Sequence, residues 1–384
     1  MNRVLVAIAI VVVASGVAWF ARRPSGPRAP IQATVAVREA LASDGTGFAR
    51  SSAPRAFSFP ADHGPHPDFR TEWWYYTGNV RAADGRRFGF QLTFFRVGLV
   101  PAVELGAAEP RASAWAARQF YFAHFAVTDV AGGRFRAFSR TSRDALGLAG
   151  ASASPFRVWI DDWSAAGDGS SARLRAGEGD VAIDLQVSAA KPPVAQGDHG
   201  LSRKGPEPGN ASFYYSLTRM PAQGVIRVGA ESLEVSGAAW MDREWSTSSL
   251  AHGVVGWDWF ALQLDDGREL MFYLFRRRDG EIDPHSAGTL VEADGATRAL
   301  LPRDVRVEIL GYWRSPRDAV RYPARWRLSV PSASLTLEVE PRLADQELVV
   351  GTRYWEGAVG VSGSGVAGHP LTGQGYVELV GYSE

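Results

Sequence analysis

Apolar and polar residues alternate with a period of two along much of this chain. Phe88, Phe90, Leu92 and Phe94 occupy every second position of one segment. The same alternation returns in three later segments, Phe120 to Ala126, Trp326 to Val330 and Leu335 to Val339, and the segment Tyr376 to Val380 closes the chain. Successive side chains of a β-strand point to opposite faces of the sheet, so the pattern predicts half-buried strands. Few stretches show the period of a helix, and the best short candidate is Arg111 to Phe120.

A tryptophan-rich strand opening occurs twice. In the first copy the order is Glu72-Trp73-Trp74-Tyr75-Tyr76, an Asp84-Gly85-Arg86 turn and a strand from Phe88 to Phe95. In the second copy it is Trp257-Asp258-Trp259-Phe260, Asp266-Gly267-Arg268 and a strand from Leu270 to Phe275. Glycine tolerates the positive φ that tight hairpin turns require. The matching order predicts two related β-domains that arose by duplication.

Many short antiparallel strands in each half favour barrels or sandwiches over parallel sheets. We therefore predict an all-β protein with two antiparallel β-barrel domains in tandem. An eight-stranded barrel has an interior large enough for one small ligand. The Gly- and Pro-rich segment from Lys191 to Gly209 is predicted to be a surface excursion of the first domain, and a lid is one role open to it.

The amino-terminal segment is apolar. Val4 to Ala21 carries no charge and is flanked by arginines on both sides. Residues 1–23 are predicted to be a signal peptide or a membrane-anchor helix, and both fates stay open because the run nearly reaches the roughly 20 residues that span a bilayer. Residues 24–56, rich in Pro, Ser, Ala and Arg, are predicted to be a linker. In a bacterium the folded part would then be periplasmic, free or anchored to the inner membrane.

The composition excludes several classes of function. The 384 residues include no cysteine, which excludes disulfides, thiolate metal sites and cysteine nucleophiles. Basic and acidic residues number 41 each, so no net field attracts nucleic acid. The 13 tryptophans, 11 tyrosines and 19 phenylalanines exceed what two small cores need, and such rings often line pockets for apolar ligands. Walker, Gly-x-Ser-x-Gly and paired-histidine zinc signatures are absent, and no cofactor is predicted.

Carboxylates among aromatic residues are the candidate chemical groups, in two clusters: Glu72-Trp73-Trp74-Tyr75 and Trp240-Met241-Asp242-Arg243-Glu244-Trp245. Partial desolvation beside the indoles would raise the pKa of Glu72. If Arg243 pairs with Glu72, Asp242 or Glu244, the clusters form a structural ion network between the domains. An acid that stays unpaired can instead donate a proton.

A third cluster places Asp258 between Trp257 and Trp259. In an extended strand Asp258 faces opposite to both rings, so it points into a lumen or into solvent. His252 lies close by in the sequence and is a further titratable candidate, with a structural histidine as the alternative.

His63 and His66 lie three residues apart, in the loop that precedes Glu72. With Glu72 as a third donor they suggest a metal site. The Gly-Pro pair between them favours a rigid turn whose imidazoles cap strand ends, so no metal is predicted.

These segments resemble the AttH/CrtC-like family of two-domain lipocalin-like proteins, which includes carotenoid 1,2-hydratases. Besides the three clusters, the resemblance is carried by Phe59-Pro60, His63-Gly64, Thr77-Gly78, Tyr354-Trp355-Glu356-Gly357, Gly375-Tyr376-Val377-Glu378-Leu379 and Gly381-Tyr382. The resemblance implies two lipocalin-like barrels, over residues 57–246 and 247–384.

The resemblance implies two divergent roles. In hydratase members an acid protonates an isolated isoprenoid double bond and aromatic rings stabilise the cation. Asp242, Asp258 or Glu72 would be that acid, with Trp240, Trp257 and Trp259 as the aromatic wall. AttH-type members are exported companions of a membrane export system, and for them the binding of a lipid or another apolar group is the more natural role.

We therefore expect an exported protein that binds a lipid or isoprenoid-like molecule near the junction of its domains, through Trp73, Trp74, Tyr75, Trp240, Trp245, Trp257 and Trp259. The expected protein partners are the permease and ATPase of an ABC-type export system, and nucleic acid is not expected. The alternative is an enzyme that hydrates an isoprenoid double bond, with Asp242, Asp258, Glu72 and His252 as candidate catalytic residues. In a third role, the tryptophans only join the two barrels, with Arg243 and Glu244 as a structural ion pair.

Overall fold

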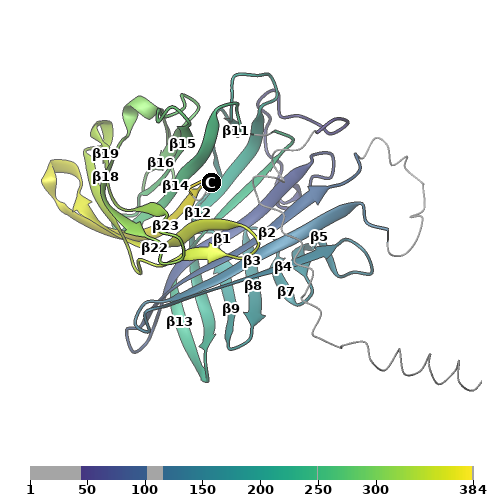
Figure 1. Ribbon diagram of the computed structural model, residues 1–384, viewed down its shortest axis with the longest axis horizontal. Helices are drawn as coiled ribbons and strands as arrows, with labels where there is room; N and C mark the ends of the chain where they lie inside the picture. The colour runs from purple at the N-terminus through teal and green to yellow at the C-terminus, as the bar shows by residue number, and fades with distance from the viewer. Residues whose placement is uncertain (1–44, 102–115, 249, 383–384) are drawn as a thin grey trace, which may run out of the picture. The chain divides into compact units, whose positions relative to one another are not determined.

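The computed structural model describes residues 45–101, 116–248 and 250–382. These residues form antiparallel β-strands and short 3-10 turns, at Ala61–His63 (η1), Pro302–Asp304 (η3), Pro331–Ala333 (η4) and Val366–Gly368 (η5), with no α-helix among them (Figure 1). The described residues contain no helix that is long and apolar enough to cross a membrane. The predicted signal or anchor helix over residues 1–23 lies outside the described residues. The described part of the predicted helix at 111–120 contains no helix, and its end belongs to a strand.

The first sheet has the strand order β4-β3-β2-β1-β13-β12-β9-β8-β7-β6-β5, with β10 and β11 paired to β12. Its strands are β1 (Thr71–Ala82), β2 (Arg87–Gly98), β3 (Gln119–Asp129), β4 (Arg134–Arg143), β5 (Ala149–Ala153), β6 (Phe156–Ile160), β7 (Trp163–Gly167), β8 (Ser171–Glu178), β9 (Val181–Ser188), β10 (Val194–Ala195), β11 (Leu201–Arg203), β12 (Ala211–Val228) and β13 (Glu231–Ser246).

The second sheet has the order β17-β16-β15-β14-β23-β22-β20-β19-β18, with β21 paired to β22. Its strands are β14 (Val254–Leu264), β15 (Glu269–Arg277), β16 (Ala287–Val291), β17 (Thr297–Leu300), β18 (Arg306–Arg314), β19 (Arg321–Val330), β20 (Leu335–Pro341), β21 (Glu347–Val349), β22 (Arg353–Ser364) and β23 (Pro370–Val380).

The two sheets repeat one topology, in agreement with the duplicated sequence pattern. In each sheet the first strand lies between the second strand and the last one, as β1 does between β2 and β13 and β14 does between β15 and β23. The two Asp-Gly-Arg turns also match. The aspartate Oδ1 accepts the arginine backbone N–H, at 3.0 Å for Asp84 and 3.1 Å for Asp266, and Oδ2 accepts the arginine Nε.

Each sheet curls around its own apolar core, and a third cluster lies between the sheets. Strand β1 shows how the alternation divides the residues. Trp74 and Tyr76 face the first core, whereas Tyr75 and Trp73 face the second sheet. Both sheets belong to one compact unit, and the division into domains 57–246 and 247–384 stays a prediction.

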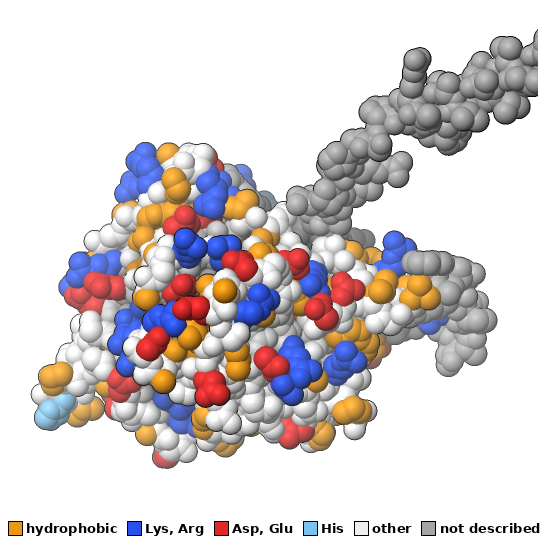
Figure 2. All heavy atoms as spheres, turned by 90° about the horizontal axis from the view of Figure 1, so that it is seen from below, with side chains coloured by type: hydrophobic (Ala, Val, Ile, Leu, Met, Phe, Trp, Pro, Cys, Tyr) orange, Lys and Arg blue, Asp and Glu red, His pale blue; other side chains and the backbone are white. Residues whose placement is uncertain are grey.

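The segment from Lys191 to Gly209 is more than a surface excursion, because one side of it packs on the second sheet. Lys191 Nζ donates to the carbonyls of Gly267 and Glu292 at 2.6 and 2.8 Å and pairs with Glu269 at 2.8 Å. Thr289 donates to Gln196 at 2.6 Å, and the hydroxyls of Ser202 and Tyr273 lie 3.0 Å apart. The segment therefore joins the sheets. On the face of the molecule shown in Figure 2, acidic and basic side chains are interspersed, consistent with the balanced charge.

Candidate functional site

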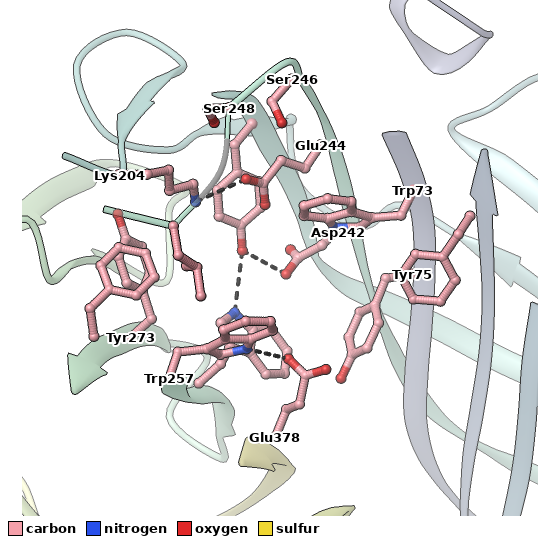
Figure 3. A pocket seen from close by; sticks show the side chains of 15 residues that line it. Trp73, Tyr75, Lys204, Asp242, Glu244, Ser246, Ser248, Trp257, Tyr273 and Glu378 are labelled. Carbon is pink, nitrogen blue, oxygen red and sulfur yellow. Dashed lines mark hydrogen bonds and ion pairs between the residues drawn. The ribbon is translucent and has the colours of Figure 1, made fainter. Parts of the chain in front are cut away.

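A chamber lies between the two sheets, outside both barrel interiors (Figure 3). Its volume is about 110 Å³, several times what one buried water requires. Its aromatic wall comes from both sheets: Trp73, Tyr75, Phe95 and Tyr214 from the first and Trp257, Trp259, Tyr273 and Phe275 from the second. Its polar groups are Lys204, Asp242, Glu244, Ser246, Ser248 and Glu378.

Strand parity explains which residues reach the chamber. Trp73 and Tyr75 alternate with Trp74 on β1, and Trp257 and Trp259 flank Asp258 on β14. Because successive side chains of a strand point to opposite faces, each run sends every second residue toward the other sheet. Contacts between the rings also restrict their orientations. Trp259 and Tyr75 pack edge to face, with their ring centroids 5.2 Å apart.

Asp242 on β13 is buried in the chamber wall. It accepts hydrogen bonds from the hydroxyls of Tyr214 (2.6 Å) and Ser216 (2.5 Å) and from the indole N–H of Trp240 (2.7 Å). Among the described residues no cation forms an ion pair with it. Burial outweighs the three hydrogen bonds and raises the pKa of Asp242 to about 7. A substantial fraction of this carboxyl is therefore protonated near neutral pH.

A second acid, Glu378 on β23, enters the chamber from the other sheet and accepts the indole N–H of Trp257 at 2.7 Å. Burial, with the nearby charges of Asp242 and Glu244, raises the pKa of Glu378 to about 7. Glu356 lies directly opposite Glu378 in the β22–β23 register. Burial and the charge of Glu378 raise the pKa of Glu356 well above its ordinary value. Glu378 and Glu356 therefore both have a raised pKa, and no cation of the described residues forms an ion pair with either of them.

Lys204 and Glu244 form an ion pair at the chamber edge, with Nζ 2.9 Å from Oε1 (Figure 3). The ammonium also lies 5.1 Å from the ring centroid of Tyr273 and 5.6 Å from those of Tyr214 and Phe275, within cation–π range. Burial opposes its charge, but Glu244 and the neighbouring tyrosine keep the pKa of Lys204 above its ordinary value. The chamber therefore holds one fixed cation and two acids that titrate near neutral pH.

Glu72 faces away from the chamber, into the first core. It forms ion pairs with Arg96 and Arg243 and accepts the backbone N–H of His66 at 3.1 Å. Although burial opposes ionisation, the two guanidinium charges hold the pKa of Glu72 well below its ordinary value. Glu72 is therefore an ionised structural group, and the expected rise of its pKa is not found. Arg243 and Glu244 do not pair with each other, because neighbouring residues of β13 point to opposite faces.

Asp258 and His252 also lie away from the chamber. Asp258 faces the far side of β14, where Arg276 Nε lies 2.8 Å and the Tyr382 hydroxyl 3.0 Å from its carboxylate. Burial raises the pKa of Asp258, and Arg276 offsets only part of that rise. His252 is exposed in the turn before β14. The structure thus brings Asp242, but not Glu72, Asp258 or His252, to the chamber.

Of the seven predicted binding residues, four line the chamber: Trp73, Tyr75, Trp257 and Trp259. Trp240 lies behind Asp242 and belongs to the apolar cluster between the sheets. Trp74 and Trp245 are packed in the first core, where the Trp74 indole donates to the carbonyl of His63 at 2.8 Å and Trp245 stacks on His66 at 3.8 Å.

The histidine pair His63 and His66 takes part in this same packing. His63 Nδ1 lies 2.6 Å from the hydroxyl of Tyr215, and burial and Arg243 lower the pKa of His63 to about 4. His66 Nε2 lies 3.0 Å from Asp62. Within the described residues no group of three His, Cys, Asp or Glu side chains is arranged to hold a metal ion.

Sequence reasoning missed several chamber residues, among them Lys204, Tyr214, Tyr273, Phe275 and Glu378. The duplication offered a signal for one of them. Because β23 occupies in the second sheet the place of β13 in the first, an acid of β23 was a candidate counterpart of Asp242. No sequence signal pointed to Lys204, because it lies on the segment from Lys191 to Gly209, which has no counterpart in the duplicated pattern.

The arrangement combines an aromatic wall with two carboxyls, Asp242 and Glu378, whose pKa is raised to about 7. Aromatic walls are typical of pockets for apolar molecules, and a protonated carboxyl beside such a wall has the chemistry of a proton donor. Rings at the wall can also stabilise a positive charge on the bound molecule.

Comparison with known proteins agrees with this architecture. The model of the AttH-like family matches residues 50–382. An AttH-type protein from Nitrosomonas europaea is 34% identical, with a TM-score of 0.76, and the match covers 87% of this chain and 99% of that one. No curated protein matches the chain.

Two more distant structures share the fold, each at 16% identity and each covering 88% of this chain and 97% of its own. They are kievitone hydratase from Nectria haematococca, with a TM-score of 0.65, and CghA with Sch210972, with a TM-score of 0.51. The predicted pair of lipocalin-like barrels is confirmed by the strand topology and by these matches. The extent of the family match and the 34% identity over most of both chains show that this chain belongs to the AttH-like family.

Proposed function

We propose that this protein binds an apolar small molecule, of the lipid or isoprenoid kind, in the chamber between its two sheets. The supporting observation is the chamber itself, with aromatic side chains from both sheets around a space of about 110 Å³. Burying apolar surface against such a wall is favourable, while the few polar groups orient the ligand.

The binding test uses protein purified without detergent, extraction with organic solvent, and mass spectrometry of the extract. We expect an apolar molecule in stoichiometric amount from the wild type and much less from Trp257→Ala, which removes one face of the chamber. Trp159→Ala is the matched control, because Trp159 lies on β6 and stacks with Arg157 away from the chamber. Equal loss in both variants, or no ligand in any sample, would contradict the proposal.

A second candidate function is acid-catalysed hydration of an electron-rich double bond. Asp242 specifically favours it, because this acid holds a proton near neutral pH and faces indole rings. One structure with the same fold is a hydratase, kievitone hydratase. In the proposed step the Asp242 proton forms a C–H bond at one alkene carbon and the other carbon becomes a cation. Water then forms the C–O bond, and its proton passes back to the Asp242 carboxylate.

The catalytic test is incubation with an acyclic isoprenoid in heavy-oxygen water. An enzyme would yield a tertiary alcohol that carries the label, and Asp242→Asn should lower its rate of formation by about 100-fold or more, the usual contribution of a general acid. Glu72→Gln, if folded, should keep the chemical step. If no labelled alcohol forms but the isoprenoid is found bound to the protein, hydration of that substrate is excluded and binding remains the proposed function.

We also propose that the protein acts outside the cytoplasm, in the periplasm or anchored to the inner membrane, beside an ABC-type permease and ATPase. The support is the uncharged run from Val4 to Ala21 and the family relationship. Cell fractionation of the full chain checks the location, and co-purification with the products of neighbouring permease genes checks the partnership. Recovery in the cytoplasmic fraction would contradict both.

A further inference from the structure

A second cavity, of about 150 Å³, lies along the same face of β1 as the chamber. Arg81 is six residues beyond Tyr75 on this strand, which corresponds to about 20 Å of extended chain. The two sheets meet between the two sites, where the amide of Asn79 donates to the carbonyl of Gly375 at 2.9 Å. The second cavity is therefore separate from the aromatic chamber.

Three arginines line this cavity, two from the first sheet and one from the second: Arg81, Arg87 and Arg342. Arg81 and Arg87 are directly opposite each other in the β1–β2 register. Like charges at opposed positions of neighbouring strands repel. The neutral polar residues Asn79, Ser236 and Gln374 also line it, and no described acidic residue does.

Arg342 follows β20 and is partly buried. Burial, and then the charges of Arg87 and Arg81, lower the pKa of Arg342 below its ordinary value. Two other partly buried arginines each meet a carboxylate: Arg276 meets Asp258 and Arg353 meets Glu347. No described carboxylate pairs with any of the three cavity arginines. Arg81 and Arg87 are solvent-exposed, whereas Arg342 is partly buried. The three positive charges line one cavity, and no described acidic residue lines it with them.

A glycine leaves room for the guanidinium of Arg342. A Cβ built on Gly360 of β22 would lie 2.6 Å from Cζ of Arg342 and 2.7 Å from Nη1. Any larger residue at position 360 would displace the guanidinium. Gly360 therefore holds open the position that Arg342 takes beside the other two arginines.

We propose that this cavity binds an oxyanion of the phosphate type. A tetrahedral dianion offers several acceptor oxygens and enough charge to offset the repulsion among three guanidinium groups, whereas a carboxylate offers only one charge and two oxygens. The cavity has room for a group of several heavy atoms. Because the arginines come from both sheets, the bound anion links the sheets. This site is independent of the apolar chamber.

The first test is calorimetric titration of the full protein with inorganic phosphate at low ionic strength, with chloride at matched ionic strength as the reference. We expect saturable binding of phosphate but not of chloride. Arg342→Gln should weaken binding by about tenfold or more, the effect of losing one charge-assisted hydrogen bond. Arg306→Gln is the matched control, since Arg306 is an exposed arginine of β18 outside the cavity. Gly360→Ala should weaken binding while it keeps all three charges.

The second test separates binding from a purely structural role. Without phosphate, Arg81→Gln should unfold at the same or a higher temperature than the wild type, because it removes a repulsive charge. With phosphate, the unfolding temperature should rise for the wild type and rise less for Arg81→Gln, because weaker binding gives less stabilisation at the same phosphate concentration.

Vesicles of phosphatidylcholine with and without phosphatidic acid identify the source of the phosphate group. Co-sedimentation that requires phosphatidic acid and Arg342 supports a lipid headgroup, and binding of free phosphate alone supports a soluble ligand. The proposal is overturned if neither form binds, if chloride acts like phosphate, or if Arg342→Gln binds as the wild type does.

Discussion

At the scale of single residues, two carboxylates on neighbouring strands differ because of what faces them. Glu72 meets two guanidinium groups, whereas Asp242 meets only hydroxyls and an indole N–H. Both are buried, and burial alone raises the pKa of any acid. At Glu72 the two guanidinium charges outweigh burial and lower the pKa. No cation among the described side chains does this at Asp242, so burial raises its pKa. An opposite charge, not burial, therefore decides which acid keeps its proton.

The raised pKa of Asp242 makes stability depend on pH. In the unfolded chain Asp242 loses its proton near pH 3.8, but in the folded protein it keeps it until about pH 7. The folded state therefore holds the extra proton between these values, and the free energy of unfolding falls as pH rises through this window. The slope is on the order of 1 kcal/mol per pH unit.

Urea unfolding of the wild type and of Asp242→Asn over this range checks the prediction. Glu378 is present in both proteins, so most of its own titration cancels in the difference. We expect the wild type to lose stability relative to the variant as pH rises. A difference that stays flat with pH would show that Asp242 is already ionised in the folded protein.

At the scale of elements, Glu72 joins three strands of the first sheet. It lies on β1 and pairs with Arg96 of β2 and Arg243 of β13, whose guanidinium lies 4.0 Å from the ring centroid of Trp74. The charged side chains of this group are fully buried. A buried ion pair contributes little net stability, but the removal of one member leaves charges that nothing balances.

Glu72→Gln should therefore cost about 3 to 5 kcal/mol of the free energy of unfolding, because two buried guanidinium groups lose their carboxylate. Chemical denaturation at neutral pH provides the measurement. Glu231→Gln is the control, since Glu231 pairs with Arg86 at the surface and its loss should change stability little. Similar effects of the two substitutions would argue against the buried network.

At the scale of the whole molecule, contacts from the segment after β9 hold the two sheets together. Lys191 brings one ammonium to two carbonyls and to Glu269, a fully buried carboxylate that also pairs with Arg219. Gln263 of the second sheet donates to the carbonyls of Thr218 and Ala239 in the first. The chamber and the arginine cavity are each lined by residues of both sheets.

Lys191→Met should lower the free energy of unfolding by about 2 to 4 kcal/mol, because two carbonyls lose their donor and Glu269 loses one of its cations. Thermal unfolding followed by near-ultraviolet circular dichroism, which reports on the packed indoles, provides the measurement. Arg175→Met removes an exposed cation within the first sheet and serves as the control. An unchanged transition in Lys191→Met would show that the sheets are held by their apolar contacts alone.

The sequence by itself determined the strands, the hairpin turns and the duplication, because these depend on local alternation and on glycine at tight turns. It also determined that Asp258 and the indoles beside it point to opposite faces. It did not determine which face of each strand meets the other sheet, because Trp73 and Trp74 are identical neighbouring residues and nothing local to the sequence distinguishes them.

Only the tertiary structure decided that choice, by packing Trp74 into the first core and Trp73 against the second sheet. It also brought Arg96 and Arg243 to Glu72, and Glu378 and Lys204 to the neighbourhood of Asp242, from positions far apart in the sequence. The pKa of an acid depends on the charges and the solvent around it, and the order of residues along one strand specifies neither of them.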